Sequence, residues 1–239
     1  MGECFNGFSG YVGDYQNYLT GLFNYPMYYS IRDVFMYRKP MTTIRDRWNE
    51  EFRSFKDLEA LGLFVDNHDN ARFLNGNGDH RLFKSALAFS LTARGIPFFY
   101  YGSEQGFTGG NDPYNREAIW NNLDTTHEIY QFVQAIMKAR KAQQIYNYQF
   151  NEKYVDAEFY GYTKGPFFVA LTNVVDGQVH RDVPNSGFSD GTVCNIFFPS
   201  DCVQVQGGVL HIFLNNGETK IFVPKTSSFF NDSPAFLAE

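Results

Sequence analysis

The sequence has little of what builds a metal centre. Its 239 residues include three cysteines, Cys4, Cys194 and Cys202, and neither C-x-x-C nor H-E-x-x-H occurs. These spacings are the usual sequence signs of zinc sites. We therefore expect no metal centre built from this chain alone.

The sequence also lacks a long apolar run and an excess of positive charge. No apolar stretch approaches the roughly 20 residues of a membrane span, so no membrane partner is expected. Twenty Lys and Arg against 26 Asp and Glu give a formal charge of −6. That charge would repel a phosphate backbone, which argues against a nucleic-acid partner. The opening MGECFNG has neither the charged start nor the apolar core of a signal peptide.

Apolar and aromatic residues, in contrast, are plentiful. Hydrophobic residues make up 44% of the chain, enough for one large domain or slightly more with a real core, which excludes a disordered protein. Aromatic residues reach 18%. Most of these are expected in the core, although such rings also stack well on the flat faces of sugars.

Residues 1–145 alternate short apolar runs with helical periods, which is typical of β/α units. We predict a strand at Leu61–Val65 and a second, buried strand at Ile96–Gly102. Between them, a helix is predicted to start after Asp79 as N-cap and to stop at Gly95.

Apolar residues at helical spacing predict three more helices in the same region. The first covers residues 27–34 with Pro26 in its first turn, and the second covers residues 44–55. The third follows residues 125–128, whose sequence TTHE has the spacing of a capping box, and runs through Ile136.

From about residue 146 the helical period disappears and short β-rich segments replace it. This pattern predicts a second, all-β domain of sandwich type over residues 146–239. The segment Val209–Pro224 is typical of a hairpin with its turn at residues 215–217.

Two of the cysteines flank a predicted turn at Pro199-Ser200-Asp201, so Cys194 and Cys202 could face each other across a hairpin. A disulfide and a pair of reduced core cysteines are both compatible with this pattern. A disulfide would favour a secreted protein or one of the secretory or lysosomal route.

The ten residues FVDNHDNARF, 64–73, place acids, amides, a histidine and an arginine where a predicted strand leaves the core. In parallel β/α architectures the chemistry gathers at the carboxyl ends of strands. Taken alone, Asn-His-Asp also suits ordinary caps and turns.

Several motifs in order resemble the α-amylases of glycoside hydrolase family 13. They are GECFNG at the start, YQNYLTGLFNYPMYY at residues 15–29, FVDNHD at 64–69 and GIPFFYYGSEQGFTGGNDPYNREAIW at 95–120. The resemblance covers residues 1 to about 145. It implies an α/β fold, with the C-terminal part of a (β/α)8 TIM barrel at 1–145 followed by a Greek-key β-sandwich.

The resemblance also implies roles for five residues. Glu3 matches the proton donor, His68 and Asp69 match residues that grip the substrate, and Asp112 and Arg116 match contacts to the donor-side sugar. Glu3 would need burial and neighbouring carboxylates to raise its pKa. Asp69 would accept hydrogen bonds from ring hydroxyls that strengthen in the transition state. An ordinary surface ion pair is the alternative for Asp112 and Arg116.

The chain departs from the family in what it lacks. The nucleophile segment G-[FL]-R-x-D-x-x-K-H, the early strand D-x-V-x-N-H and the loop domain that holds calcium are all absent. The resemblance therefore implies Ca²⁺ only for a longer protein, with ligands outside this chain. We interpret the chain as the C-terminal part of an α-amylase in which Met1 was an internal residue.

These features lead to a functional hypothesis. The full protein is expected to be a monomer that hydrolyses internal α-1,4-glucosidic bonds of starch, glycogen or malto-oligosaccharides with retention, and this chain alone is expected to be inactive. The alternative is a non-catalytic carbohydrate-binding or partner-binding protein that keeps half of an amylase fold.

Overall fold

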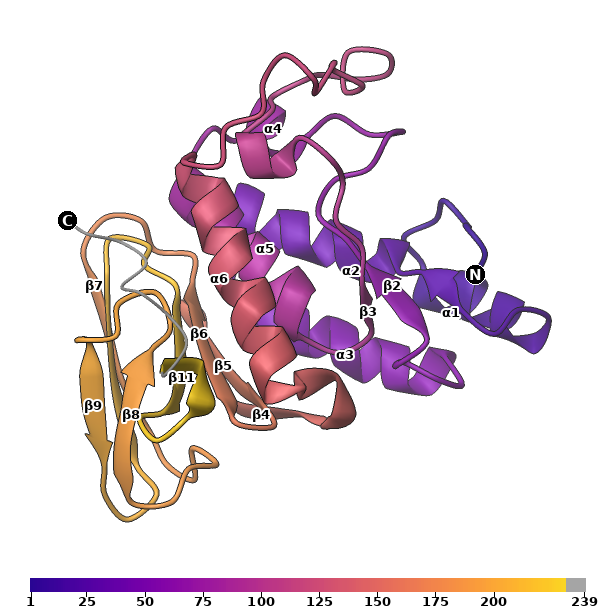
Figure 1. Ribbon diagram of the computed structural model, residues 1–239. Coiled ribbons are helices and arrows are strands. Elements are labelled where there is room, and N and C mark those ends of the chain that lie inside the picture. The colour runs from indigo at the N-terminus through magenta and orange to yellow at the C-terminus, as the bar shows by residue number, and fades with distance from the viewer. Residues whose placement is uncertain (231–239) are drawn as a thin grey trace.

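The computed structural model describes residues 1–230, and the predicted all-β region extends beyond them to residue 239. Helices dominate the first part and strands the second (Figure 1). The helices are α1 (Ser9–Asp14), α2 (Tyr25–Ile31), a π-helical segment (Arg32–Met36), α3 (Thr42–Ser54), α4 (Phe73–Gly76), α5 (His80–Thr92) and α6 (Glu128–Gln143). Short 3-10 turns lie at Tyr15–Asn17, Ser103–Gln105, Ile145–Asn147 and Ser228–Phe230.

The strands form three sheets. They are β1 (Leu22–Phe23), β2 (Leu61–Leu63), β3 (Ile96–Pro97), β4 (Phe150–Val155), β5 (Phe159–Lys164), β6 (Phe167–Thr172), β7 (Gln178–Val183), β8 (Gly191–Asn195), β9 (Cys202–Val205), β10 (Leu210–Asn215) and β11 (Lys220–Pro224). The first sheet has the order β1-β2-β3 and is parallel. Gly2 adds a parallel bridge to Leu22. These strands do not close into a barrel within residues 1–230.

The prediction of a buried strand at Ile96–Gly102 is wrong in two respects: the strand ends at Pro97, and its first residue, Ile96, is 43% exposed. β3 lies at the edge of its sheet, where β2 is its one strand partner in the described part of the chain. Phe98 still donates its backbone N–H to the Leu63 carbonyl at 2.7 Å. After it the chain leaves the ladder, and more than a third of the Phe99 and Tyr101 surfaces is exposed.

The helices start largely where the sequence predicts. The Asp79 side chain caps α5 by accepting the Arg81 N–H, and Pro26 lies in the first turn of α2. The capping box predicted at residues 125–128 is wrong: the side chain that caps α6 is His127, which accepts from the Ile129 N–H at 3.2 Å.

The Glu128 side chain, which a capping box would need, turns away to other partners. It contacts His80 Nδ1 at 2.6 Å and Lys84 Nζ at 2.5 Å, both on α5. The Glu128 side chain therefore forms an ion pair between two helices instead of the reciprocal bond of a capping box.

The β region consists of two antiparallel sheets with the strand orders β4-β5-β6-β11-β8-β9 and β10-β7. The hairpin predicted around residues 215–217 is wrong, because β10 pairs with β7 whereas β11 pairs with β6 and β8. The turn itself is present, with positive φ at Asn216 and Gly217. Asn216 bonds to Gly177 through both its backbone and its side chain, so the turn passes the chain from one sheet to the other.

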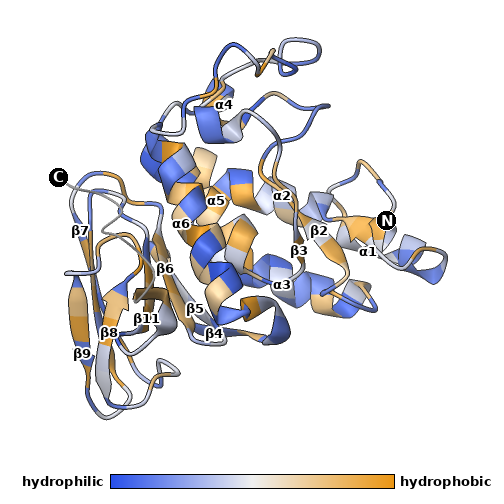
Figure 2. Cartoon of the chain, viewed as in Figure 1, coloured by the Kyte–Doolittle hydropathy of each residue, from blue (hydrophilic) through white to orange (hydrophobic). Residues whose placement is uncertain are grey.

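The central strands β5, β6 and β11 of the six-stranded sheet are buried on both faces, whereas the edge strands β4 and β9 are mostly exposed or half-buried. One face shares a core with α5 and α6, and the other packs against the apolar face of β7 and β10. All six residues of β6, FFVALT, are buried, which explains why this strand reads as a continuous apolar run. Figure 2 shows hydrophobic and hydrophilic positions alternating along α6, and its apolar residues belong to the core shared with this sheet.

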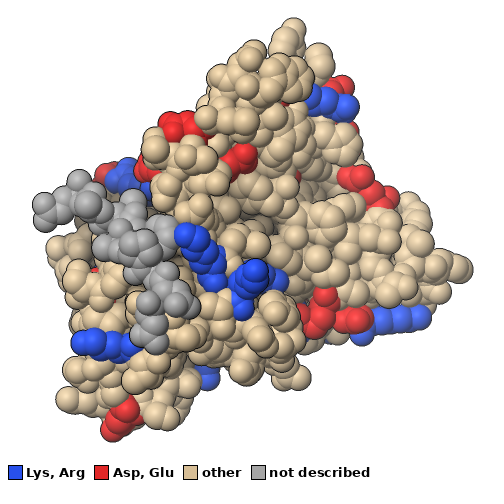
Figure 3. All heavy atoms as spheres, viewed as in Figure 1, with Lys and Arg blue, Asp and Glu red and all other residues tan. Residues whose placement is uncertain are grey.

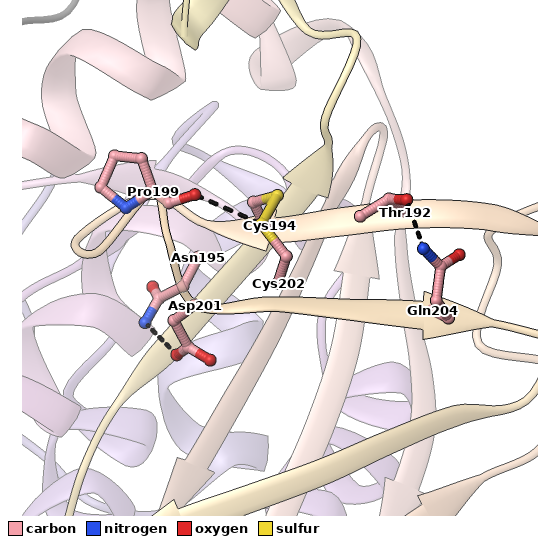
Figure 4. Close-up of a disulfide and its surroundings, with 7 residues drawn as sticks. All are labelled: Thr192, Cys194, Asn195, Pro199, Asp201, Cys202 and Gln204. Atoms are coloured by element: carbon pink, nitrogen blue, oxygen red, sulfur yellow. Dashed lines mark hydrogen bonds between the residues drawn. A yellow bond between two sulfur atoms is a disulfide. The ribbon is translucent and has the colours of Figure 1, made fainter.

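The disulfide between Cys194 and Cys202 is confirmed. The two cysteines are a directly opposed pair of β8 and β9, and their Cα atoms are 4.0 Å apart, slightly closer than the usual 4.4 to 6.8 Å (Figure 4). Asn195 Nδ2 donates to Asp201 Oδ2 at 3.1 Å, beside the bridge. The pairing of the strands thus brings the two thiols together.

Figure 3 shows charged side chains in small groups, with uncharged atoms between them, on the face that it draws. No broad basic surface is visible on that face. Among the helices of residues 1–230, none combines the length and apolar character needed to cross a membrane.

Candidate active site

The candidate residues of the sequence gather at one edge of the parallel sheet. Because the bridge at Gly2 and the strands β1 to β3 are all parallel, their carboxyl ends share this edge. Glu3 follows the Gly2 bridge, Asn24 follows β1, and the segment 64–69 follows β2. This is the edge at which parallel β/α proteins place their sites.

Glu3 is held by a side chain of the neighbouring strand end. The Tyr25 hydroxyl donates to Glu3 Oε1 at 2.7 Å and itself accepts from Asn67 Nδ2 at 2.8 Å. Tyr25 is fully buried, and burial together with the Glu3 carboxylate raises its pKa, so the hydroxyl keeps its proton. The prediction that Glu3 is buried is wrong for residues 1–230 taken by themselves, in which Glu3 is exposed.

Asp66 anchors the segment that follows β2. It is buried, and its carboxylate accepts from the Phe73 N–H at 2.7 Å and from Ser103 Oγ at 2.9 Å, with Arg32 Nη2 at 3.6 Å. Burial raises the pKa of this carboxyl. These partners fix the start of the loop that carries His68 and Asp69.

A small network shapes the tip of that loop. Asn67 Oδ1 accepts from the backbone N–H of Asp69 at 3.2 Å and of Asn70 at 3.0 Å. The buried Asn115 donates from Nδ2 to the Asn70 carbonyl at 2.8 Å. The backbone is thereby set while the His68 and Asp69 side chains stay about half exposed.

Four of the predicted site residues contact one another. Asp69 Oδ1 lies 3.4 Å from His68 Nε2 and 3.5 Å from Arg116 Nη2. Arg116 Nε contacts Asp112 Oδ1 at 2.6 Å and donates to the His68 carbonyl at 3.2 Å. Arg116 therefore joins the loop after β2 to the loop near residue 112.

Sequence reasoning missed Arg72, a buried residue that also links the loop after β2 to the segment near residue 117. Its side chain is fully buried, its Nε contacts Glu117 Oε2 at 2.8 Å, and its Nη1 donates to the Tyr101 carbonyl at 3.0 Å. The guanidinium also lies 4.5 Å from the centre of the Tyr100 ring. An arginine within the apolar run ARFL is the one sequence signal of such a buried role.

A cavity of about 170 Å³ opens beside Glu3. Its lining is mostly aromatic, with acidic and amide groups at the margin. The lining residues are Glu3, Phe23, Phe64, Asp66, Asn67, His68, Phe98, Phe99 and Tyr100. A cavity with aromatic walls and a few convergent polar groups is typical of a site for a small, partly apolar ring such as a sugar.

The one group of three metal-binding side chains found close together in residues 1–230 is His180, Asp182 and His211. It contains two imidazoles, whereas calcium prefers six to eight oxygen ligands.

The fold and the site define a β/α protein whose candidate site lies at the carboxyl edge of a parallel sheet. A family profile described as alpha amylase, catalytic domain, matches residues 14–159. The chain therefore belongs to the alpha-amylase family.

Individual relatives agree with this assignment. The chain is 37% identical to a beta/alpha-amylase of Paenibacillus polymyxa over 93% of this chain and 19% of the relative. It is 32% identical to an alpha-amylase of Saccharomycopsis fibuligera, over 94% of this chain and 47% of the relative. The structure of an alpha-amylase from Malbranchea cinnamomea superimposes with a TM-score of 0.88 at 30% identity, over 95% of this chain and 50% of that one. The chain thus spans half or less of the length of these relatives.

Proposed function

We propose that this chain supplies the proton-donor side of a retaining α-1,4-glucan hydrolase site, with starch or malto-oligosaccharides as substrate. The observation that carries the proposal is the placement of Glu3, which the Tyr25 hydroxyl holds at the carboxyl edge of the sheet beside the aromatic cavity. Membership of the alpha-amylase family supports the substrate class. Retaining hydrolysis needs one such acid and one attacking carboxylate.

Glu3 acts as general acid through a defined oxygen. The Tyr25 hydroxyl donates to Oε1, so Oε1 serves as acceptor and the transferable proton belongs on Oε2. Asn67 donates to the Tyr25 oxygen and so keeps the phenol proton directed at Glu3. From Oε2 the proton passes to the glycosidic oxygen as that bond breaks.

His68, which lines the cavity, and the adjacent Asp69 bind ring hydroxyls. Arg116 and His68 lie within 3.5 Å of Asp69 Oδ1, and the carboxylate keeps further acceptor positions for sugar hydroxyls. Bonds from sugar hydroxyls to this carboxylate strengthen as the ring flattens toward an oxocarbenium ion. Arg116 and Asp112 hold the loop and offer further polar contacts to the sugar.

The attacking carboxylate has no candidate in this cavity. Asp66 is the second acidic residue of the lining, and its carboxylate already has Phe73, Ser103 and Arg32 as partners. We propose that the chain is the C-terminal part of a (β/α)8 barrel followed by a β-sandwich, and that a longer protein supplies the nucleophile. Any calcium ligands would belong to that other part as well.

Substitution of Glu3 in a longer protein that completes the barrel tests the proposal. Glu3→Gln keeps the shape and removes the proton, so kcat for starch should fall by a factor on the order of 10² to 10⁴. Glu50→Gln is the matched control, because Glu50 lies on α3 and does not line the cavity. If the Glu3 variant keeps more than a tenth of the activity, the assignment is wrong.

Asp69→Asn tests the role of the second carboxyl in the same protein. Its hydrogen bonds are worth most in the transition state, so the loss should appear mainly in kcat. An effect confined to KM would contradict the assignment.

Residues 1–239 alone should not hydrolyse starch. Release of reducing ends from amylose should match that of a Glu3→Gln control of the same chain. Activity above the control would require a nucleophile within this chain. Binding of malto-oligosaccharides without hydrolysis by the longer protein would instead favour the non-catalytic alternative.

A further inference from the structure

The outer face of the two-stranded sheet carries three side chains that suit a transition metal. Residues alternate along β7 and β10, so that Val179 and Ile212 point into the core while His180, Asp182 and His211 lie on the exposed face. This face is separate from the candidate active site, and the family assignment does not involve it.

Strand register brings the three side chains together. His211 stands directly opposite Asp182 in the antiparallel pair, and His180 lies two residues before Asp182 on the same face. His211 Nδ1 is 2.6 Å from Asp182 Oδ1, and His180 Nε2 is 3.4 Å from the same oxygen. One ligand atom from each residue lies within 4.8 Å of the other two.

These separations are close to those of a tetrahedral zinc site. Zinc–nitrogen and zinc–oxygen bonds of about 2.0 to 2.2 Å place neighbouring ligand atoms roughly 3.3 Å apart. All three side chains are exposed, so small rotations about their side-chain bonds are possible. Such rotations can lengthen the 2.6 Å contact between His211 and Asp182 and shorten the largest separation between ligand atoms. A bound water would complete the four-coordinate set.

The nearest basic group does not compete for this carboxylate. Arg181 points to the opposite face of β7, where Nε contacts Asp156 Oδ2 at 2.5 Å and Nη2 contacts Glu158 Oε2 at 3.1 Å. The pair of His80 with Glu128, which joins two helices, is a poorer candidate for a metal site. The Lys84 ammonium already contacts the Glu128 carboxylate.

We propose that His180, Asp182 and His211 bind one Zn²⁺ ion that links β7 to β10. Two imidazoles and one carboxylate favour zinc and other transition metals over calcium or magnesium. The sequence alone gives no sign of this group because its members come from strands about 30 residues apart, which no short motif records. The ion would tie together the smallest antiparallel sheet of the molecule and stabilise it by binding only the folded state.

Zinc titration of the full chain without a histidine tag tests the proposal. Isothermal titration calorimetry with ZnCl₂ should give one ion per chain. His180→Ala and His211→Ala should each weaken binding at least tenfold, whereas the control His80→Ala should bind like the parent. Cys4, the one free cysteine among the described residues, is changed to serine in all of these proteins so that its thiol cannot contribute.

Thermal unfolding supplies the second measurement. Zinc should raise the midpoint of the parent and of His80→Ala and leave that of His180→Ala unchanged, while CaCl₂ at the same concentration should not reproduce the rise. The metal-free midpoint of His180→Ala should agree with that of the parent, since this side chain is exposed. Absence of zinc binding to the parent, or unchanged zinc affinity in both His180→Ala and His211→Ala, would overturn the proposal.

Discussion

The buried carboxyl group of Glu51 should make the free energy of unfolding decrease as pH rises. This residue of α3 has no exposed surface. Its Oε2 accepts from Asn24 Nδ2 at 3.0 Å, and its Oε1 has no hydrogen-bond partner within the described residues. Burial raises the pKa of this carboxyl to about 8 from an ordinary value of 4.5.

The sign of the effect follows from proton binding in the two states. Between the unfolded pKa of 4.5 and the folded pKa of about 8, the folded protein holds a proton on Glu51 that the unfolded chain has lost. Stability should therefore fall as pH rises through this range, by up to about 1.4 kcal/mol per pH unit. At neutral pH the total loss from this group would be about 3 kcal/mol.

Glu51→Gln removes the titration and keeps an oxygen that can accept from Asn24. We expect the variant and the parent to have similar stability near pH 4.5 and the variant to become progressively more stable as pH rises toward 8. Urea unfolding of both proteins at several pH values measures the difference. Glu50→Gln is the control, because Glu50 is partly exposed and pairs with Arg47, so its substitution should change stability by roughly 0.5 kcal/mol or less. A constant difference between the Glu51 variant and the parent across this range would refute the reasoning.

Three further predictions concern other parts of the chain. Contacts with Lys84 and then His80 lower the pKa of Glu128 to about 2, so the stability they supply should be lost as pH falls from 4.5 toward 2. Glu128→Gln should therefore cost about 1 kcal/mol in melts at neutral pH, a value reduced for the exposure of the pair, and almost nothing in melts near pH 2. Replacing Cys194 and Cys202 together by serine should lower stability by about 2 kcal/mol in denaturant melts, and an unchanged midpoint would argue against the bridge. Tyr25→Phe should lower kcat of a completed enzyme by roughly tenfold, because Glu3 loses its one hydrogen bond from a neighbouring strand end; an unchanged kcat would show that Glu3 is positioned in another way.

The sequence predicts well those elements whose signals are local. The α5 helix begins after Asp79 because that side chain and the first-turn N–H groups are neighbours in the chain. The cysteine pair is predictable for a similar reason: the turn at 199–201 lies between two short strands, and pairing across it places Cys194 opposite Cys202.

Elements that depend on distant partners could not be predicted in this way. The turn at Asn216 and Gly217 forms, but whether β10 pairs with β11 is decided by competition from β7, β6 and β8. The box at 125–128 has the correct spacing, yet the α5 groups that attract Glu128 are more than 40 residues away. The segment 96–102 has a strand partner on one side only, β2, and most of it does not form a strand.

The same division holds within the candidate site. His68, Asp69, Asp112 and Arg116 were found through motifs and do contact one another. Tyr25 and Arg72 were missed, because nothing in their local sequence shows that one would bond to Glu3 and the other would join two loops.

The position of Glu3 is set by neighbouring strand ends. Its position depends on Gly2, which bonds to Gly21 and Phe23 of the β1 region, and on the Tyr25 hydroxyl that Asn67 holds. All of these partners belong to this chain. Under the proposed function, contacts among the parallel strand ends described here set the position of Glu3, whereas the attacking carboxylate would come from a different part of a longer protein. An enzyme assembled in this way would have its two carboxyl groups positioned by different parts of the chain, so substitutions around Tyr25 should disturb proton donation without displacing the nucleophile.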